Sequence, residues 1–264
     1  MKIECGSLEY AHARVHARHG QRIDEPGWRA IEALRGLAAV LERARGTALR
    51  PWLVGIAADS APAQIESTLR GHGLALVDEA STWMPLPWQA AVSWCAVLPE
   101  LAPLQHLARG EPPQSWMLSD PRWRALAGAE GPTRHAELAG TDGPWAALAS
   151  AWPAPQTLGD AWLAEWRRRL PRAAEDAEDT DDADSALAAL RRTVIDHSHA
   201  FATAPPDRGW LLRTALRARL VLLLRRSALG PVAVFIHLAL CALDLERLRA
   251  ELLRRALFPR WMVA

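Results

Sequence analysis

The stretch from Val232 to Leu243 constrains the fold more than any other part of the chain. It is apolar throughout except for His237, and it follows a break at Gly230-Pro231. A helix that is apolar all round must be buried on every side. The stretch covers only about half of a bilayer span. After Leu243 the sequence becomes amphipathic. We therefore expect a long final helix whose first half is buried in the core of the protein.

Helical periodicity also dominates the rest of the chain, whereas alternating runs of β-branched and aromatic residues are missing almost everywhere. This pattern predicts an all-α protein. Apolar residues from Trp28 to Leu41 recur at three- and four-residue spacing, which predicts one helix after the break at Pro26-Gly27. Further helices are expected at 8–21, from Pro87 to Cys95, and at 160–170, 185–202 and 208–227.

Several small residues indicate where helices begin and end. Ser60 is a candidate N-cap for a short helix that holds Ile65 and Leu69 and stops at 71–73, where two glycines occur. Pro99 and Pro103 are expected to kink or interrupt the helix that begins at Pro87. The segment 110–155 is rich in Pro, Gly and Trp and is interpreted as short helices joined by ordered turns.

An acidic segment suggests how the chain divides. Residues 175–184 are almost all Asp, Glu and Ala, which is typical of a solvated linker. We expect an N-terminal helical lobe at 1–110, a Pro- and Trp-rich helical segment at 111–172, an acidic linker at 173–184 and a C-terminal helical lobe at 185–264. No fixed-period repeat of the solenoid type is visible.

The charge balance excludes several function classes. Lys and Arg total 31 and Asp and Glu total 30, so the strong basic excess of a dedicated nucleic-acid binder is missing. Lys2 is the only lysine, which rules out a phosphate-binding GxxxxGK[ST] loop and a Schiff-base lysine. We expect neither nucleic acid nor a small-molecule substrate as a partner.

Nucleophile and disulfide patterns are missing as well. Cys5, Cys95 and Cys241 are odd in number and form no CxxC pair, which predicts reduced thiols in a cytosolic protein. The first residues lack the apolar core of a signal peptide. The chain has no GxSxG elbow, and we expect no cysteine beside a histidine base. We expect no catalytic residue and no cofactor, and thirteen tryptophans that fill cores and interfaces.

Three histidines form the strongest metal-binding pattern. His12, His16 and His19 lie at i, i+4 and i+7 of the first expected helix and share one face, and imidazoles one turn apart can chelate a transition metal. No HExxH glutamate accompanies them. A metal-dependent enzyme that uses these histidines is one hypothesis. The favoured interpretation is a solvated or interface face without a metal.

The two ends of the chain resemble one known family. Tyr10-Ala-His-Ala-Arg14-Val15 is similar to the opening Y-x-x-A-R-V of the C-type subunits of V/A-type ATPases, whose eukaryotic counterparts are the V-ATPase d-type subunits, and Gly20 and Ile23 follow as in that family. The closing elements also occur in the family's order: Leu229-Gly230-Pro231, the apolar helix, Asp244, Arg247-Leu248-Arg249 and Pro259.

The middle of the chain departs from the family pattern. Where the family has Asp-x-x-Asn-Leu, this chain has Glu100-Leu-Ala-Pro103-Leu104 in the first repeat and Asp196-His-Ser-His199 in the second. The resemblance implies a funnel-like, multi-lobe helical bundle. The acidic segment would mark a place where one lobe is reduced.

The resemblance implies a non-catalytic rotor connector. Its partners would be the central-stalk subunits and the membrane rotor ring of a V-type ATPase, and it would lie peripherally on the cytoplasmic face of the inner membrane. Arg14, Arg18, Arg247 and Arg249 are the predicted partner-interface residues, each with an internal salt bridge as the alternative. A helical adaptor or scaffold of another multiprotein machine, such as a secretion apparatus, is the alternative function.

Overall fold

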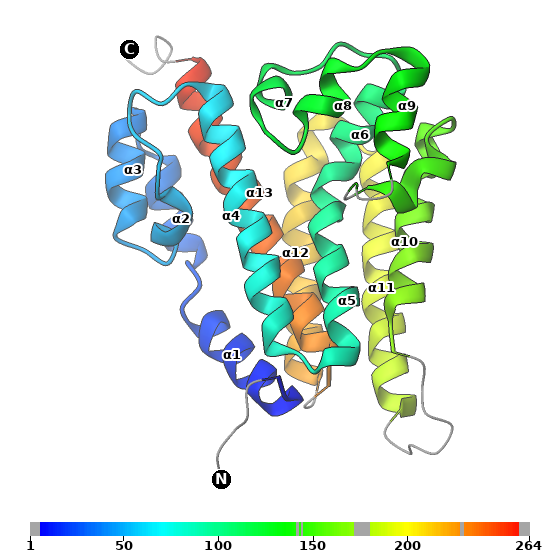
Figure 1. The fold of residues 1–264 in the computed structure, drawn as a ribbon. Helices are drawn as coiled ribbons and strands as arrows, with labels where there is room; N and C mark the ends of the chain where they lie inside the picture. The colour runs from blue at the N-terminus through cyan, green and yellow to red at the C-terminus, as the bar shows by residue number, and fades with distance from the viewer. Residues whose placement is uncertain (1–5, 141–142, 144, 172–179, 228–229, 259–264) are drawn as a thin grey trace.

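The computed structural model describes residues 6–140, 143, 145–171, 180–227 and 230–258. Throughout these residues the regular structure is helical, so the predicted all-α bundle is confirmed (Figure 1). The six helices of the main bundle are α4 (Pro62–Trp83), α5 (Leu86–Trp94), α10 (Leu158–Arg169), α11 (Thr180–Thr203), α12 (Gly209–Arg226) and α13 (Val232–Leu257).

The remaining helices are shorter. They are α1 (Leu8–Gly20), α2 (Glu25–Glu32), α3 (Leu37–Arg45), α6 (Leu101–Ala108), α7 (Ser115–Ser119), α8 (Arg124–Gly128) and α9 (Gly131–Ala139). Within the described ranges the 3-10 helices are η1 (Arg50–Leu53), η2 (Cys95–Glu100), η3 (Ala146–Ala151), η4 (Pro155–Thr157) and η5 (Pro206–Arg208).

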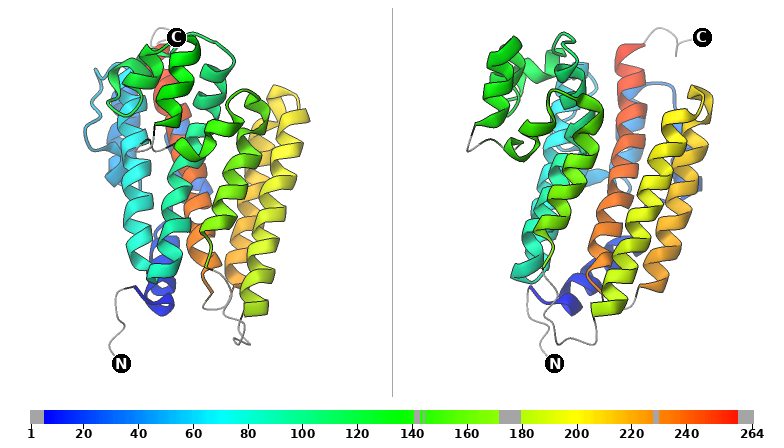
Figure 2. Two further views of the ribbon diagram at one scale, coloured as in Figure 1. Left: turned by 45° about the vertical axis from the view of Figure 1, so that its right-hand side comes forward. Right: turned by 90° about the vertical axis from the view of Figure 1, so that its right-hand side faces the viewer.

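The long helices form two layers, which Figure 2 shows edge-on in its right-hand view. Helices α4, α5 and α10 pack side by side in one layer, and α11, α12 and α13 form the other. The closest packing between the layers is that of α13 on α4. Helix α1 lies across one end of the bundle, while α2 and α3 flank α4 and α13 near the other end.

Helix α13 is the centre of the fold, as its sequence predicts. Every residue from Val232 to Leu238 is buried, including His237. Farther along, Leu248 and Leu252 are fully buried in a second cluster of apolar side chains. The apolar first half and the amphipathic second half of α13 therefore serve two different cores.

Both cores combine residues from the two ends of the chain. The larger core joins the first half of α13 to α1, α4, α5 and the helices that follow, and it includes buried tryptophans such as Trp83, Trp123 and Trp166. The smaller core joins α2, α3, η1 and the start of α4 to the second half of α13. The expected N-terminal and C-terminal lobes thus share both cores.

The expectation for the helix after Ser60 is wrong. Helix α4 begins at Pro62 and runs for 22 residues straight through Gly71 and Gly73. Ser60 does not cap it, since its Oγ accepts a hydrogen bond from the Ala57 amide at 2.9 Å. Glycine costs a helix about 1 kcal/mol per residue. Packing against α13 overrides this cost, and a Cβ on Gly73 would lie 3.6 Å from Leu245 Cδ1.

The single helix predicted from Trp28 to Leu41 is two helices. Helix α2 starts before the Pro26-Gly27 pair, because Asp24 Oδ1 accepts the Gly27 amide at 2.8 Å and Pro26 fits the first turn. Helix α2 ends at Glu32, and α3 starts at Leu37. The carbonyl groups exposed at this break are bound by Arg255, whose guanidinium donates to Leu34 O at 2.5 and 3.0 Å.

Other boundaries follow the sequence more closely. Pro99 lies in η2, which separates α5 from α6, so the predicted interruption is confirmed. The segment 110–155 forms short helices, as expected. Residues 173–179 of the predicted acidic linker lie outside the described residues. Helix α11 begins at Thr180, so the last five residues of the predicted linker are helical.

Candidate functional site: ionic contacts of α13 and the exposed α11–α12 hairpin

Arg14 and Arg18, two of the predicted interface residues, share one carboxylate on α4. Their Nη2 atoms donate to Glu79 Oε1 at 2.8 and 2.7 Å. Both guanidinium groups also lie over the Trp83 ring, 5.2 and 5.7 Å from its centroid. About 40% of each arginine side chain stays exposed. These residues hold α1 to α4 and present their outer edges to solvent.

Arg247, the third predicted interface residue, is buried. It makes a two-point contact with Glu25 at 2.8 and 3.0 Å and donates to Glu32 at 2.6 Å. Its guanidinium lies between Trp28 and Trp210, at 4.7 and 4.8 Å from the ring centroids. The hydrogen bond from Arg247 lowers the pKa of Glu25. Arg247 therefore joins α13 to α2 and α12 within the chain.

Arg249, the fourth, begins a series of ion pairs that runs through α4. It contacts Glu66, which also accepts from Arg70 at 2.8 Å, and Arg70 reaches Glu100 at 3.0 Å. Glu100 is buried, and burial raises its pKa, although Arg70 and Arg122 act in the opposite direction. Arg249 lies at the outer end of this series, where 44% of its side chain is exposed to solvent.

A second ionic cluster has no counterpart in the sequence-based predictions. Asp244 is buried and pairs with both Arg22 and Arg217, which joins α13 to the end of α1 and to α12. Arg22 also donates to the Leu240 carbonyl at 2.6 Å. An acidic residue directly after twelve residues of apolar helix is a visible signal that its carboxylate needs a partner. Its arginine partners carry no comparable signal.

One thiol and one imidazole are in contact, contrary to the expectation that no cysteine stands beside a histidine. His237 and Cys241 are one turn apart on α13, and Cys241 Sγ lies 3.7 Å from His237 Nε2. Burial lowers the pKa of His237 to about 3 and raises the pKa of Cys241 to about 11. Both groups are neutral at pH 7, so the pair lacks the thiolate that nucleophilic catalysis requires.

The three histidines of α1 do not act as one group. His12 and His16 face each other with their Nε2 atoms 3.0 Å apart. The Nδ1 of His19 is buried without a hydrogen-bond partner. In the part of the chain that the structure describes, no set of three or more His, Cys, Asp and Glu residues could hold a metal ion.

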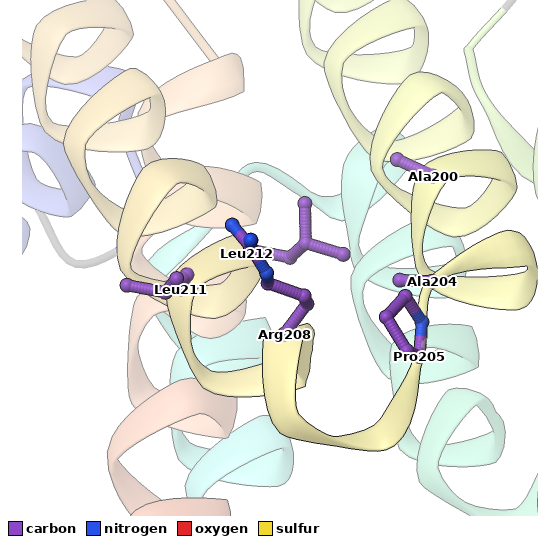
Figure 3. A pocket seen from close by; sticks show the side chains of 6 residues that line it. All are labelled: Ala200, Ala204, Pro205, Arg208, Leu211 and Leu212. Carbon is purple, nitrogen blue, oxygen red and sulfur yellow. The ribbon is translucent and has the colours of Figure 1, made fainter.

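The hairpin of α11 and α12 exposes several large apolar side chains, among them Phe201, Trp210 and Leu211. A shallow hollow of about 470 Å³ lies at its tip, and Figure 3 shows Leu212 pointing into the space between the two helices. The hollow is lined by Ala200, Ala204, Pro205, Arg208, Leu211 and Leu212. Leu211 and Trp210 are 60% and 40% exposed. These exposed apolar side chains make the hairpin tip a candidate contact surface.

Comparison with known proteins adds no relative. No protein-family model, no curated protein and no solved structure matches this chain. Among the described residues, none of the helices combines the length and the apolar character that a bilayer crossing requires.

Proposed function

We propose that this protein is a non-catalytic connector of a V-type ATPase, which joins the soluble central stalk to the membrane rotor ring at the cytoplasmic face of the inner membrane. The proposal starts from the resemblance at the two ends of the chain. The observation that supports it most is that these two ends lie against each other. Helix α1, which carries Tyr10 to Val15, packs on α13 and α4.

Ion pairs join the same two segments. Arg22, just after α1, pairs with Asp244, the acidic residue of the closing segment. Arg247 of the same segment pairs with Glu25 and Glu32 of α2. The first and last segments, more than 200 positions apart in sequence, thus belong to one structural unit, which is expected when a resemblance at both ends reflects a shared fold rather than chance.

A connector that transmits torque must not deform under load. In this chain α13 is bound to α1, α2, α4 and α12 by apolar packing together with buried ion pairs. These pairs fix the position of α13 against its neighbours at several points along its length. This internal bracing is what a mechanical coupling requires.

The connector also needs surfaces for permanent docking. Interfaces of lasting complexes are more apolar than the average protein surface. The α11–α12 hairpin exposes Trp210 and Leu211, and the end of α13 exposes Leu257 and Phe258 at 55% and 54%. These two surfaces are the docking candidates.

The test is isolation of the complex from the native cell. A tag on this chain is expected to recover V-type catalytic, central-stalk and ring subunits from solubilised membranes, and the purified chain alone is expected to hydrolyse no ATP. A V-type complex purified through its ring without this chain would refute the proposal.

The second candidate is a helical adaptor of another machine, such as a secretion apparatus. The exposed α11–α12 hairpin favours it equally, because that surface does not depend on the family resemblance. The same purification separates the two candidates by the identity of the recovered subunits.

A further inference from the structure

The pair His12 and His16 has a geometry that the proposed function does not use. The two residues are one turn apart on α1, their ring centroids lie 4.2 Å apart and their Nε2 atoms 3.0 Å apart. His16 is exposed and His12 is half-buried. In two neutral imidazoles, one Nε2–H donates to the lone pair of the other. The two Nε2 atoms are also the atoms through which His12 and His16 could bind a metal ion together.

We propose that His12 and His16 bind one divalent copper or nickel ion through their Nε2 atoms. Imidazole nitrogens bind such ions at about 2.0–2.1 Å. Two nitrogens 3.0 Å apart then subtend about 94° at the ion. That angle is close to the roughly 90° between neighbouring ligands in the square-planar and tetragonal sites of Cu(II) and Ni(II). It is well below the tetrahedral angle of about 109° that structural zinc sites adopt.

The protonation state suits this role. A metal requires the neutral imidazole. Each ring must therefore present an unprotonated Nε2 to the ion. When the ion binds, each ring keeps one proton, on Nδ1, and the hydrogen that the two Nε2 atoms shared moves to that position. The pair stays neutral throughout.

The surroundings of His12 hold its ring in place. His12 is half-buried and its ring packs on that of His16, with the centroids 4.2 Å apart. The nearby cations Arg14 and Arg18 repel a metal ion, but both are paired with Glu79.

Two protein ligands leave the other positions of the ion to water. His19 supplies no third ligand, and no set of three or more ligands occurs in the described residues. The site is therefore an open, exchangeable one on the surface of α1. It requires neither of the two functions proposed above.

The test is metal titration of the full chain, purified without a histidine tag and in a Cys5→Ser background so that this thiol does not compete. Isothermal titration with Cu(II) and Ni(II) is expected to show one ion per chain at pH 7. The electron paramagnetic resonance spectrum of the copper complex is expected to be tetragonal, with splitting from two nitrogens.

Three substitutions decide which residues bind. His12→Gln and His16→Gln each leave one imidazole, so affinity is expected to fall on the order of a hundredfold, as the second contact of a chelate is lost. His19→Gln is the matched control and is expected to leave affinity unchanged. Circular dichroism checks that each variant is folded. Unchanged affinity in His16→Gln, an equal loss in His19→Gln, or no binding by the unsubstituted chain would overturn the proposal.

Discussion

Helices α12 and α13 are neighbours in one layer and are both rich in leucine, alanine and arginine, yet their burial differs greatly. In α13, 15 of 26 residues are buried, whereas in α12 only Gly209, Leu220 and Leu224 of its 18 residues are. Helix α13 has α1, α3, α4, α11 and α12 as neighbours, while α12 packs mainly against α11 and α13. Position in the topology, rather than apolar content, therefore decides which of the two helices forms the core.

Arginine follows the same division. On α13, Arg247 and Arg255 are buried and bind carboxylates or carbonyl groups of α2. On α12, Arg219, Arg225 and Arg226 are exposed and make no ion pair with any described residue. The arginines of α13 hold the fold together, and those of the outer face of α12 are available for contacts outside it.

The largest expected effect is the difference in stability loss between removing a buried carboxylate of α13 and removing an exposed one. Asp244→Ala leaves the half-buried Arg22 and Arg217 without their buried carboxylate partner, and we expect a loss of about 3–5 kcal/mol in the free energy of unfolding. Glu246→Ala removes the partially exposed partner of Arg213 and is expected to cost at most about 1 kcal/mol. Urea unfolding measures both values. Similar losses in the two variants would show that burial does not set the strength of these pairs.

The second effect compares one leucine from each helix. Leu248→Ala opens a cavity in the smaller core and is expected to cost about 2–5 kcal/mol. Leu222→Ala on α12 changes a side chain that is 47% exposed, and a change within about 0.5 kcal/mol is expected. The same unfolding assay applies. A large loss for Leu222→Ala would contradict the exposed position of this side chain and would mean that this face of α12 is buried.

The third effect is a dependence on pH that comes from α13. The pKa of His237 is about 3 in the folded protein and 6.5 when unperturbed. Between these two pH values the unfolded state binds a proton at this residue and the folded state does not. Stability from this group is complete above pH 6.5 and falls by about 1.4 kcal/mol per pH unit as the pH drops toward 3. His237→Leu is expected to remove this part of the slope in urea unfolding at pH 7 and pH 5. Equal slopes with and without His237 would contradict its buried, neutral state.

The smallest effect concerns the contact between the two helices. Trp210→Ala removes a ring of α12 that is 40% exposed and lies over Arg247, and we expect a loss of about 1 kcal/mol. Differential scanning calorimetry would measure it as a small decrease in Tm. A loss as large as that of Leu248→Ala would mean that the hairpin tip supports the core.

Much of this fold is visible in the sequence, because helical periodicity is a local property. The burial of 232–238 and the interruption at Pro99 follow from residue types alone. The break between α2 and α3 does not, since the apolar spacing continues across it through Leu34. The passage of α4 through two glycines depends on α13, which lies about 170 residues farther along the chain.

The candidate site is harder to predict for the same reason. Arg247 is one of the predicted interface residues, but its partners Glu25 and Glu32 are more than 200 residues away and give no local signal. The contact between His237 and Cys241 is accessible to sequence reasoning, since a spacing of four residues places both on one face of a helix. Whether that contact is reactive depends on burial by other helices, which the spacing does not reveal.

The central position of α13 has a consequence for biosynthesis. Both hydrophobic cores require this helix, and among the described helices it is the last one to leave the ribosome. Until then the apolar faces of α2, α3 and α4 lack the helix they pack against, and the Leu34 carbonyl after α2 lacks its hydrogen-bond donor Arg255. Exposed apolar surface of this kind favours aggregation. The nascent chain is thus expected to mature only after α13 has been translated, and to depend on chaperones until that moment.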